Sequence, residues 1–230
     1  MRPVLRFRVS WGAAMSARWR WSPASWGILI VLACIWVGYL ILVSGLPDEV
    51  LIARYRAKTL REIEIAGNSD PPNVEVLTAA LSGPDWFASA VAAQRIGELS
   101  HSEKLKSNQR EIAIRSLVAA LASGGHWWRF GWDEDEPEFE QFRGEAIEAT
   151  SSFGQEALAA VNSALNGTSP LGREAACWIV LSMLKSGAVD QAILTKQGVS
   201  ESIRQVARND PHEGAKAACR SVQNYSGQHN

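Results

Sequence analysis

The feature that most constrains this chain is a helical pattern of small residues that recurs through its C-terminal part. Its clearest copy is residues 82–99, SGPDWFASAVAAQRIGEL, in which a Ser-Gly-Pro-Asp turn opens a helix rich in alanine. Proline presets such a corner, and the aspartate side chain caps the helix that follows. Small residues at a contact let two helix axes approach to about 8–10 Å. The stretch therefore predicts closely stacked helices.

Weaker copies of this pattern follow, so that residues 74–222 are predicted to form four helix pairs. The predicted pairs are 74–81 with 86–99, 110–123 with 139–153, 155–166 with 171–184, and 200–208 with 213–222. The second helices share a small-residue core, at 90–93, 145–147, 174–177 and 216–219. An apolar residue marks the end of each first helix, namely Leu81, Leu121, Leu165 or Val206. We predict helix caps at Asp85, Ser169 and Asp210.

Several of these residues resemble the HEAT-repeat family, in particular the short bacterial HEAT-like repeats first noted in phycobilisome lyases. The matching residues are Pro84-Asp85, Ala92-Ala93 and Ile96-Gly97-Glu98-Leu99 in the first unit, and Arg173-Glu174-Ala175-Ala176 with Leu181 in the third. The second and fourth units are degenerate. The resemblance covers residues 74–222 and implies an all-α fold, a right-handed α-solenoid of about four helix pairs. It implies no function, since such arrays serve many roles, and no residue here indicates a bilin site.

A second constraint lies near the N-terminus, where residues 26–46 form an almost wholly apolar run of 21 residues. About 20 apolar residues suffice for a helix to cross the hydrocarbon layer, so we predict a transmembrane helix in the lipid bilayer from Trp26 to Leu46. A basic, tryptophan-rich segment, residues 1–25, precedes it. The alternative is a cleaved signal peptide, although the apolar core of such peptides is usually only about 7–15 residues long. The run holds no ionisable carboxylate, amine or imidazole that would serve transport.

The orientation of this predicted span is nearly balanced, because basic residues flank it on both sides. The arginines nearest the span precede it, whereas Asp48 and Glu49 dilute the positive charge on the other flank. This favours a cytoplasmic N-terminus. We therefore predict a single-pass protein of the bacterial inner membrane whose C-terminal domain lies outside the cytoplasm.

Residues 47–73 are predicted to form a juxtamembrane helix over 47–66 and then a linker, GNSDPPN, rich in helix-breaking residues. The helix either covers the open end of the helix array, which we favour, or rests its basic residues on anionic lipid headgroups. At the other end of the chain, residues 223–230 form a polar tail that we expect to fray.

The second unit contains an insertion, residues 124–138, where other units have a four-residue turn. Its candidate partner-binding residues are Trp127, Trp128, Phe130, Trp132, Asp133, Glu134, Asp135 and Glu136. Aromatic side chains can anchor a protein partner, and the acids could attract a basic segment or a divalent cation. Alternatively, the tryptophans fold back over the helices while the acids face water. A calcium loop is not predicted, because the spaced Asx ligands and their central glycine are missing.

The charge distribution argues against nucleic-acid binding. The formal net charge is −1, but five of the 23 basic residues precede residue 48, which leaves 18 basic against 24 acidic residues in the remainder. Binding to phosphates requires a basic face. The four histidines are dispersed, and HExxH, GxSxG and phosphate-binding glycine loops are missing. We therefore predict no enzyme activity and no catalytic, cofactor-binding or metal residue, and we interpret Arg173 and Glu174 as exposed charges.

Two cysteines allow a further prediction. Cys177 and Cys219 follow the same Ala-Ala pair in successive units, so they are expected at equivalent places on neighbouring helices. Helix axes about 10 Å apart would hold the two Cα atoms beyond the usual reach of a disulfide. We therefore expect two buried free thiols.

These observations favour a membrane-tethered, non-enzymatic scaffold that binds a protein partner through the groove of the helix stack or through the insertion. An alternative is a lyase-like or assembly subunit that handles a cofactor-bearing protein. A third is a purely structural part of a larger membrane complex.

Overall fold

The computed structural model describes residues 48–123 and 137–228, and every element in these residues is helical. The chain divides into two compact units, residues 1–51 and 52–230, and the packing described here is that of the second unit. The helices are α2 (Asp48–Asn68), α3 (Val74–Leu81), α4 (Trp86–His101), α5 (Ser107–Ala122), α6 (Pro137–Ser151), η2 (Gly154–Ala157), α7 (Leu158–Leu165), α8 (Pro170–Ser186), α9 (Gln191–Lys196), α10 (Val199–Asn209) and α11 (Glu213–Gln228). Within these residues, no helix has both the length and the apolar character that a membrane crossing requires. The predicted span, residues 26–46, and the segment before it lie outside the described residues.

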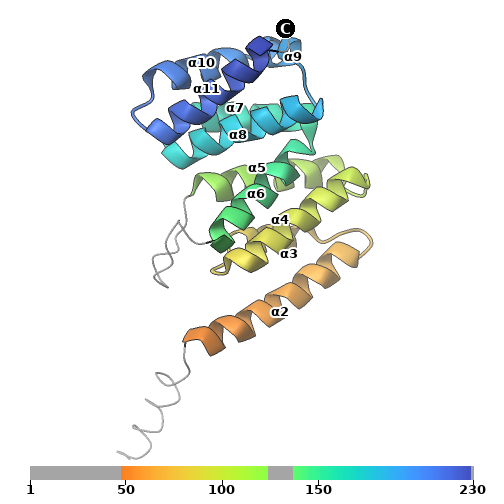
Figure 1. The fold of residues 1–230 in the computed structure, drawn as a ribbon. Helices are drawn as coiled ribbons and strands as arrows, with labels where there is room; N and C mark the ends of the chain where they lie inside the picture. The colour runs from red at the N-terminus through yellow and green to blue at the C-terminus, as the bar shows by residue number, and fades with distance from the viewer. Residues whose placement is uncertain (1–47, 124–136, 229–230) are drawn as a thin grey trace, which may run out of the picture. The chain divides into compact units, whose positions relative to one another are not determined.

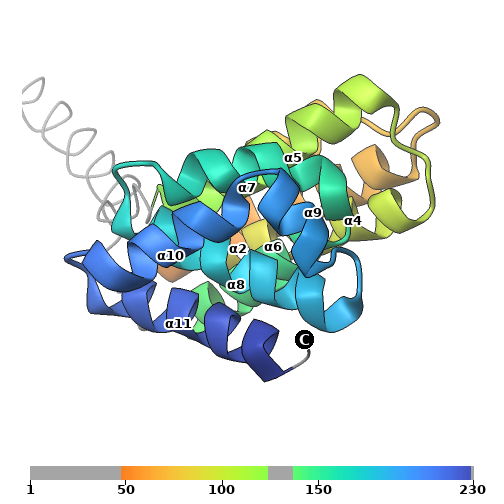
Figure 2. The same ribbon diagram turned by 90° about the horizontal axis from the view of Figure 1, so that it is seen from above.

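From α3 onward the helices form pairs stacked one on the next (Figure 1). α3 packs against α4, α5 against α6, α7 against α8, and α10 against α11. The second helices of the pairs, α4, α6, α8 and α11, contact one another in succession, and the first helices α3, α5, α7 and α10 do the same. Seen along the stack, α8 and α11 lie on one side, with α5 and α7 on the other (Figure 2). The fold is all-α and has two layers.

The observed helices agree with the predicted pairs, with differences mainly at their ends. α3 has the predicted bounds, whereas α5 begins three residues earlier than predicted and α7 is preceded by one turn of 3₁₀-helix. The short helix α9 was not predicted. α11 continues to Gln228, so residues 223–228 are helical where the polar sequence suggested fraying.

Small residues hold the layer of second helices together. Ala90, Ala92 and Ala93 on α4 are fully buried. Gly97 lies so close to α6 that a Cβ atom built on it would be 3.3 Å from the Cα of Ala149. Such short side chains let the two helices approach closely, as the sequence predicted. The physical reason given for the recurring alanines therefore holds for this contact.

α2 covers the first helix pair. Ile63 and Ala66 of α2 are buried, with exposed fractions of 2% and 4%. The guanidinium of Arg56 donates to both carboxylate oxygens of Asp85, at 2.8 and 2.9 Å, and also pairs with Glu138 at 3.0 Å. These contacts agree with the favoured interpretation that this helix covers the end of the array, and they leave Arg56 engaged within the protein.

Two of the three predicted helix caps are confirmed. The carboxylate of Asp85 accepts a hydrogen bond from the backbone N–H of Phe87, and the hydroxyl of Ser169 accepts one from that of Gly172. The prediction for Asp210 is wrong, because α11 begins at Glu213 and the imidazole of His212 accepts the backbone N–H of Ala215 instead.

The prediction of two free thiols is also wrong. Cys177 on α8 and Cys219 on α11 form a disulfide with a Cα–Cα distance of 5.0 Å, and both residues are fully buried. The prediction used an average helix spacing. That spacing separates the helix axes, however, whereas each Cα atom lies about 2.3 Å from its own axis, so two Cα atoms that face each other come within reach of a disulfide.

Candidate functional site

A groove of about 650 Å³ runs between α6 and α8, on the layer of second helices. Two polar contacts between α6 and α8 show how these two helices are aligned. Arg143 on α6 donates to Glu174 on α8 at 2.5 Å, and the hydroxyls of Ser151 and Ser182 lie 3.1 Å apart. Each of these pairs joins residues 31 positions apart in the sequence, so α6 and α8 run in parallel. The groove follows this shared direction.

The floor of the groove is apolar. Ile147 from α6 lines it together with Trp178 and Leu181 from α8. The Nε1 atom of Trp178 is buried and has no hydrogen-bond partner among the described residues, whereas the residue as a whole is partly exposed. The atoms of this side chain that are exposed in the groove are therefore carbon atoms. A partly exposed indole is available for contact with another apolar surface.

At Gly144, no side chain projects from the α6 wall of the groove. It is the central residue of α6 and is exposed, and a Cβ atom built on it would meet nothing within 4 Å. The position therefore faces open space. This contrasts with Gly97 on α4, whose missing side chain is required by the packing against α6.

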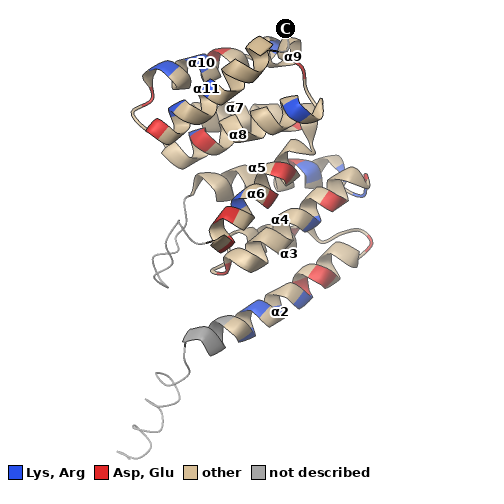
Figure 3. Cartoon of the chain, viewed as in Figure 1, with Lys and Arg blue, Asp and Glu red and all other residues tan. Residues whose placement is uncertain are grey.

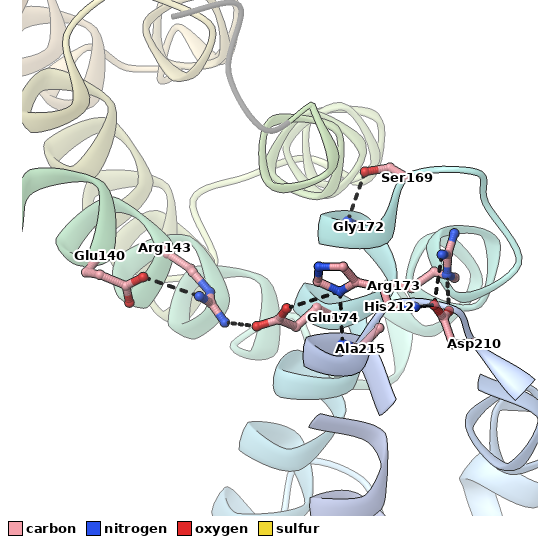
Figure 4. Close-up of polar contacts among 9 residues, drawn as sticks. All are labelled: Glu140, Arg143, Ser169, Gly172, Arg173, Glu174, Asp210, His212 and Ala215. Carbon is pink, nitrogen blue, oxygen red and sulfur yellow. Dashed lines mark hydrogen bonds and ion pairs between the residues drawn. The ribbon is translucent and has the colours of Figure 1, made fainter. Parts of the chain in front are cut away.

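Ion pairs occupy the end of the groove where both helices begin (Figure 4). Arg143 lies between Glu140, at 3.3 Å, and Glu174. The second carboxylate oxygen of Glu174 lies 3.9 Å from Nδ1 of His212. This network carries a net charge of −1 while His212 is neutral, because one arginine is shared by two carboxylates.

A second ion pair lies beside this network and joins α8 to the turn before α11. The guanidinium of Arg173 donates to both carboxylate oxygens of Asp210 and to the backbone carbonyl of Gly167 at 2.9 Å. The hydrogen bond from Arg173 lowers the pKa of Asp210, and the backbone N–H of His212 lowers it further against the opposing effect of burial. The prediction that Arg173 and Glu174 are exposed is wrong, since their side chains are only 12% and 15% exposed.

Four charged side chains line the groove, namely the acids Glu140 and Glu148 and the bases Arg143 and Lys185. Glu148 takes part in no ion pair within the described residues, whereas Glu145 is not among the lining residues and interacts with Glu98 on α4. Burial raises the pKa of Glu145, and the nearby charges of Glu148 and Glu98 raise it further. On the α8 side, charged residues occupy only the two ends of the helix (Figure 3), with Lys185 near the far end and no charged residue over 175–184.

The chemistry of this arrangement suits non-covalent recognition. An apolar floor is flanked by charged side chains of both signs, and the two hydroxyls that meet across the groove, those of Ser151 and Ser182, bond to each other. Over residues 48–123 and 137–228, no three His, Cys, Asp or Glu side chains come together as metal ligands would. The groove thus offers contacts to a partner's side chains.

The candidate binding residues predicted from the insertion, Trp127 to Glu136, lie outside the described residues. Glu138, which ends the insertion, is described and pairs with Arg56. The groove itself was named in the sequence-based hypothesis only as a general feature of the helix stack, without residues. The ten consecutive uncharged residues in α8, 175–184, gave no separate signal for it, because they are accounted for by the packing of α8 against α5, α6, α7 and α11.

Comparison with known proteins gave no match, whether among family models, curated proteins or solved structures. The function must therefore be argued from the chain's own sequence and geometry.

Proposed function

We propose that this protein is a membrane-tethered interaction module without catalytic activity, which binds a protein partner in the groove between α6 and α8. The observation that carries this proposal is the open apolar floor formed by Ile147, Trp178 and Leu181. Contiguous apolar surface rimmed by polar residues can mark an interaction site, and tryptophan is enriched among the residues that contribute most of the binding energy in known interfaces.

The proposal includes a short α-solenoid of HEAT-like helix pairs as the scaffold. Its support is the succession of helix pairs in two layers and the small residues buried between the second helices. In such arrays each pair contacts mainly its neighbours, so an open face runs along the stack and is available for binding. The polar outer residues of α11, among them Arg220, Gln223 and Asn224, suit a terminal pair that faces water.

The proposed location of this module is outside the cytoplasm, held by the apolar segment 26–46 as a membrane anchor. The disulfide between Cys177 and Cys219 supports this location, because disulfides form and persist in oxidising compartments such as the bacterial periplasm. The basic residues that precede the apolar segment support the same location, because basic residues favour the cytoplasmic side of a membrane span.

Photo-crosslinking in intact cells tests the groove. A benzophenone amino acid replaces Ile147 on the groove floor, and in a matched control it replaces Ile112, an isoleucine of α5 in the other layer that is 42% exposed. We expect a discrete protein adduct from position 147 and none of the same mass from position 112. Equal adducts from both positions, or none from position 147, would refute docking in the groove.

A second pair of variants tests whether the groove must be open. Gly144→Trp places a large side chain in the open space above the floor, whereas Gly227→Trp adds the same side chain at a helical glycine of α11 that also has nothing within 4 Å. The adduct from position 147 should disappear in Gly144→Trp and persist in Gly227→Trp. Persistence in both variants would contradict the proposal.

A further inference from the structure

We propose that a pocket between α9, α10 and α11 is a second binding site, which takes a small organic carboxylate with an apolar body. The pocket has a volume of about 340 Å³ and lies in the last helices of the stack (Figure 1). It shares no lining residue with the α6–α8 groove, so the site is independent of the proposed function. Three of its properties select the ligand, namely the sign of its charges, its free hydrogen-bond donors and its apolar floor.

Both charged residues that line the pocket are arginines. Arg204 and Arg208 are four residues apart on α10, so their side chains lie on the same face of this helix. Arg204 pairs with Glu201, which does not itself line the pocket. Arg208 has no ion pair within the described residues. The C-terminal end of α10 favours a cation at this position, but no described hydrogen bond uses a donor of Arg208.

The free hydrogen-bonding groups of the pocket are mainly donors. The hydroxyl of Ser226 donates to the side-chain oxygen of Gln191 at 3.0 Å, and the side-chain nitrogen of Gln191 donates to the hydroxyl of Ser200 at 3.1 Å. These bonds join α9, α10 and α11 and engage the three side chains with one another. The guanidinium of Arg208 and the side-chain amide of Gln223 have no described partner. A ligand rich in acceptor oxygens would satisfy their N–H groups.

The floor of the pocket is apolar. Each of its three helices contributes one buried aliphatic residue to the lining, namely Leu194, Ile203 and Val222. Small-molecule sites commonly combine such a lining with a few polar groups, in pockets of about 300–1,000 Å³. A bare inorganic ion would leave this floor uncovered, whereas the carbon body of an organic anion would contact it.

The charge around the pocket favours a carboxylate over a phosphate ester. The two arginines and Glu201 together carry a net charge of +1, since two positive charges face one negative charge. A carboxylate carries −1 and matches this value, whereas a phosphate monoester carries about −1.5 to −2 at pH 7. A planar carboxylate can also accept two parallel hydrogen bonds from one guanidinium, which fits the free Arg208.

Three fluorinated aromatic compounds that differ in their charged group test this site. They are para-fluorobenzoate, para-fluorobenzylamine and para-fluorophenyl phosphate. Their binding to the full-length protein in phosphatidylcholine nanodiscs is followed by fluorine NMR, and empty nanodiscs measure their partition into lipid. We expect para-fluorobenzoate to bind at least about tenfold more tightly than the amine and also more tightly than the phosphate ester.

Variants of exposed arginines locate the binding. Arg208→Gln should weaken para-fluorobenzoate binding about tenfold, because it removes a charged hydrogen-bond donor. Arg208→Lys retains the charge without the two parallel bonds, so its affinity should fall between those of Arg208→Gln and wild type. The matched control is Arg220→Gln, at an exposed arginine of α11 outside the lining, and it should leave binding unchanged.

The outcomes distinguish this site from the α6–α8 groove. Gly144→Trp, which fills the groove, should leave para-fluorobenzoate binding unchanged. Loss of binding in that variant, binding unaffected by Arg208→Gln, or no binding of para-fluorobenzoate to wild type would overturn the site. Equal binding of the amine, or tighter binding of the phosphate ester, would overturn the carboxylate as its ligand. None of these results bears on docking of a protein in the groove, which the crosslinking experiment tests.

Discussion

Replacing Gly144 by alanine should stabilise this protein. Glycine in the interior of a helix costs roughly 0.5–1 kcal/mol relative to alanine, because it loses more backbone freedom on folding. Gly144 is the central residue of α6, and the added Cβ atom would meet nothing within 4 Å, so no steric cost offsets this gain. We therefore expect the free energy of unfolding to rise by about 0.5–1 kcal/mol, or about 1–4 °C in midpoint for a chain of this size.

The same change at Gly97 should have the opposite sign. Gly97 also lies inside a helix, so alanine brings the same gain in helix propensity. Its Cβ atom, however, would be 3.3 Å from the Cα and 3.4 Å from the Cβ of Ala149 on the neighbouring helix. Overpacking of a close contact typically costs about 1–3 kcal/mol, which leaves a net loss of up to about 2 kcal/mol.

The assay is thermal unfolding of the full-length protein in a mild detergent, followed by circular dichroism at 222 nm. Wild type, Gly144→Ala and Gly97→Ala are measured side by side, with the double variant as a check that the two effects add. Stabilisation by Gly97→Ala equal to that by Gly144→Ala would refute the close approach of α4 and α6. Destabilisation by Gly144→Ala would refute the open position on which the groove depends.

Three further changes have definite expected outcomes. Asp210→Asn should lower stability at pH 7 by about 1–3 kcal/mol. The lowered pKa of Asp210 stabilises the fold above the unfolded value of about 3.9, and this contribution is lost as the pH falls towards the folded value, so the variant should show a smaller drop in thermal midpoint between pH 5 and pH 3. Thiol labelling after denaturation without reductant should leave Cys177 and Cys219 unmodified, and the variant with alanine at both positions should lose up to about 4 kcal/mol, as loop entropy predicts for a separation of 42 residues. Ser169→Ala should cost about 1 kcal/mol in chemical denaturation through loss of the helix cap, whereas Ser169→Asn should retain most of that stability.

Much of the fold follows from local patterns that can be seen in the sequence. The bounds of α3 and the caps at Asp85 and Ser169 depend on neighbouring residues alone, since a turn, a capping side chain and a helical apolar period act within a few positions. The burial of the alanines on α4 was predicted for the same reason.

Other features depend on contacts between residues far apart in the chain, and these could not be predicted. The disulfide requires Cys177 and Cys219 to face each other across the contact between α8 and α11, which the spacing of helix axes alone does not decide. The cap expected at Asp210 is not formed because α11 begins only at Glu213, where His212 takes the capping role. The carboxylate of Asp210 instead accepts hydrogen bonds from Arg173, 37 residues earlier, and from the backbone N–H of His212. The burial of Arg173 follows from the same pairing.

The sequence by itself determined most of the helices within residues 74–123 and 137–222 and the caps of α4 and α8, because helix formation and capping are decided within a few neighbouring residues. It also indicated the burial of the small residues of α4, since Ala90, Ala92 and Ala93 recur at helical spacing and are fully buried. Only the tertiary structure decided that α6 and α8 leave an apolar groove between them and that Trp178 and Ile147 line it together. Both properties depend on the parallel alignment of two helices, which is set by packing across the whole stack and is not encoded in either helix alone.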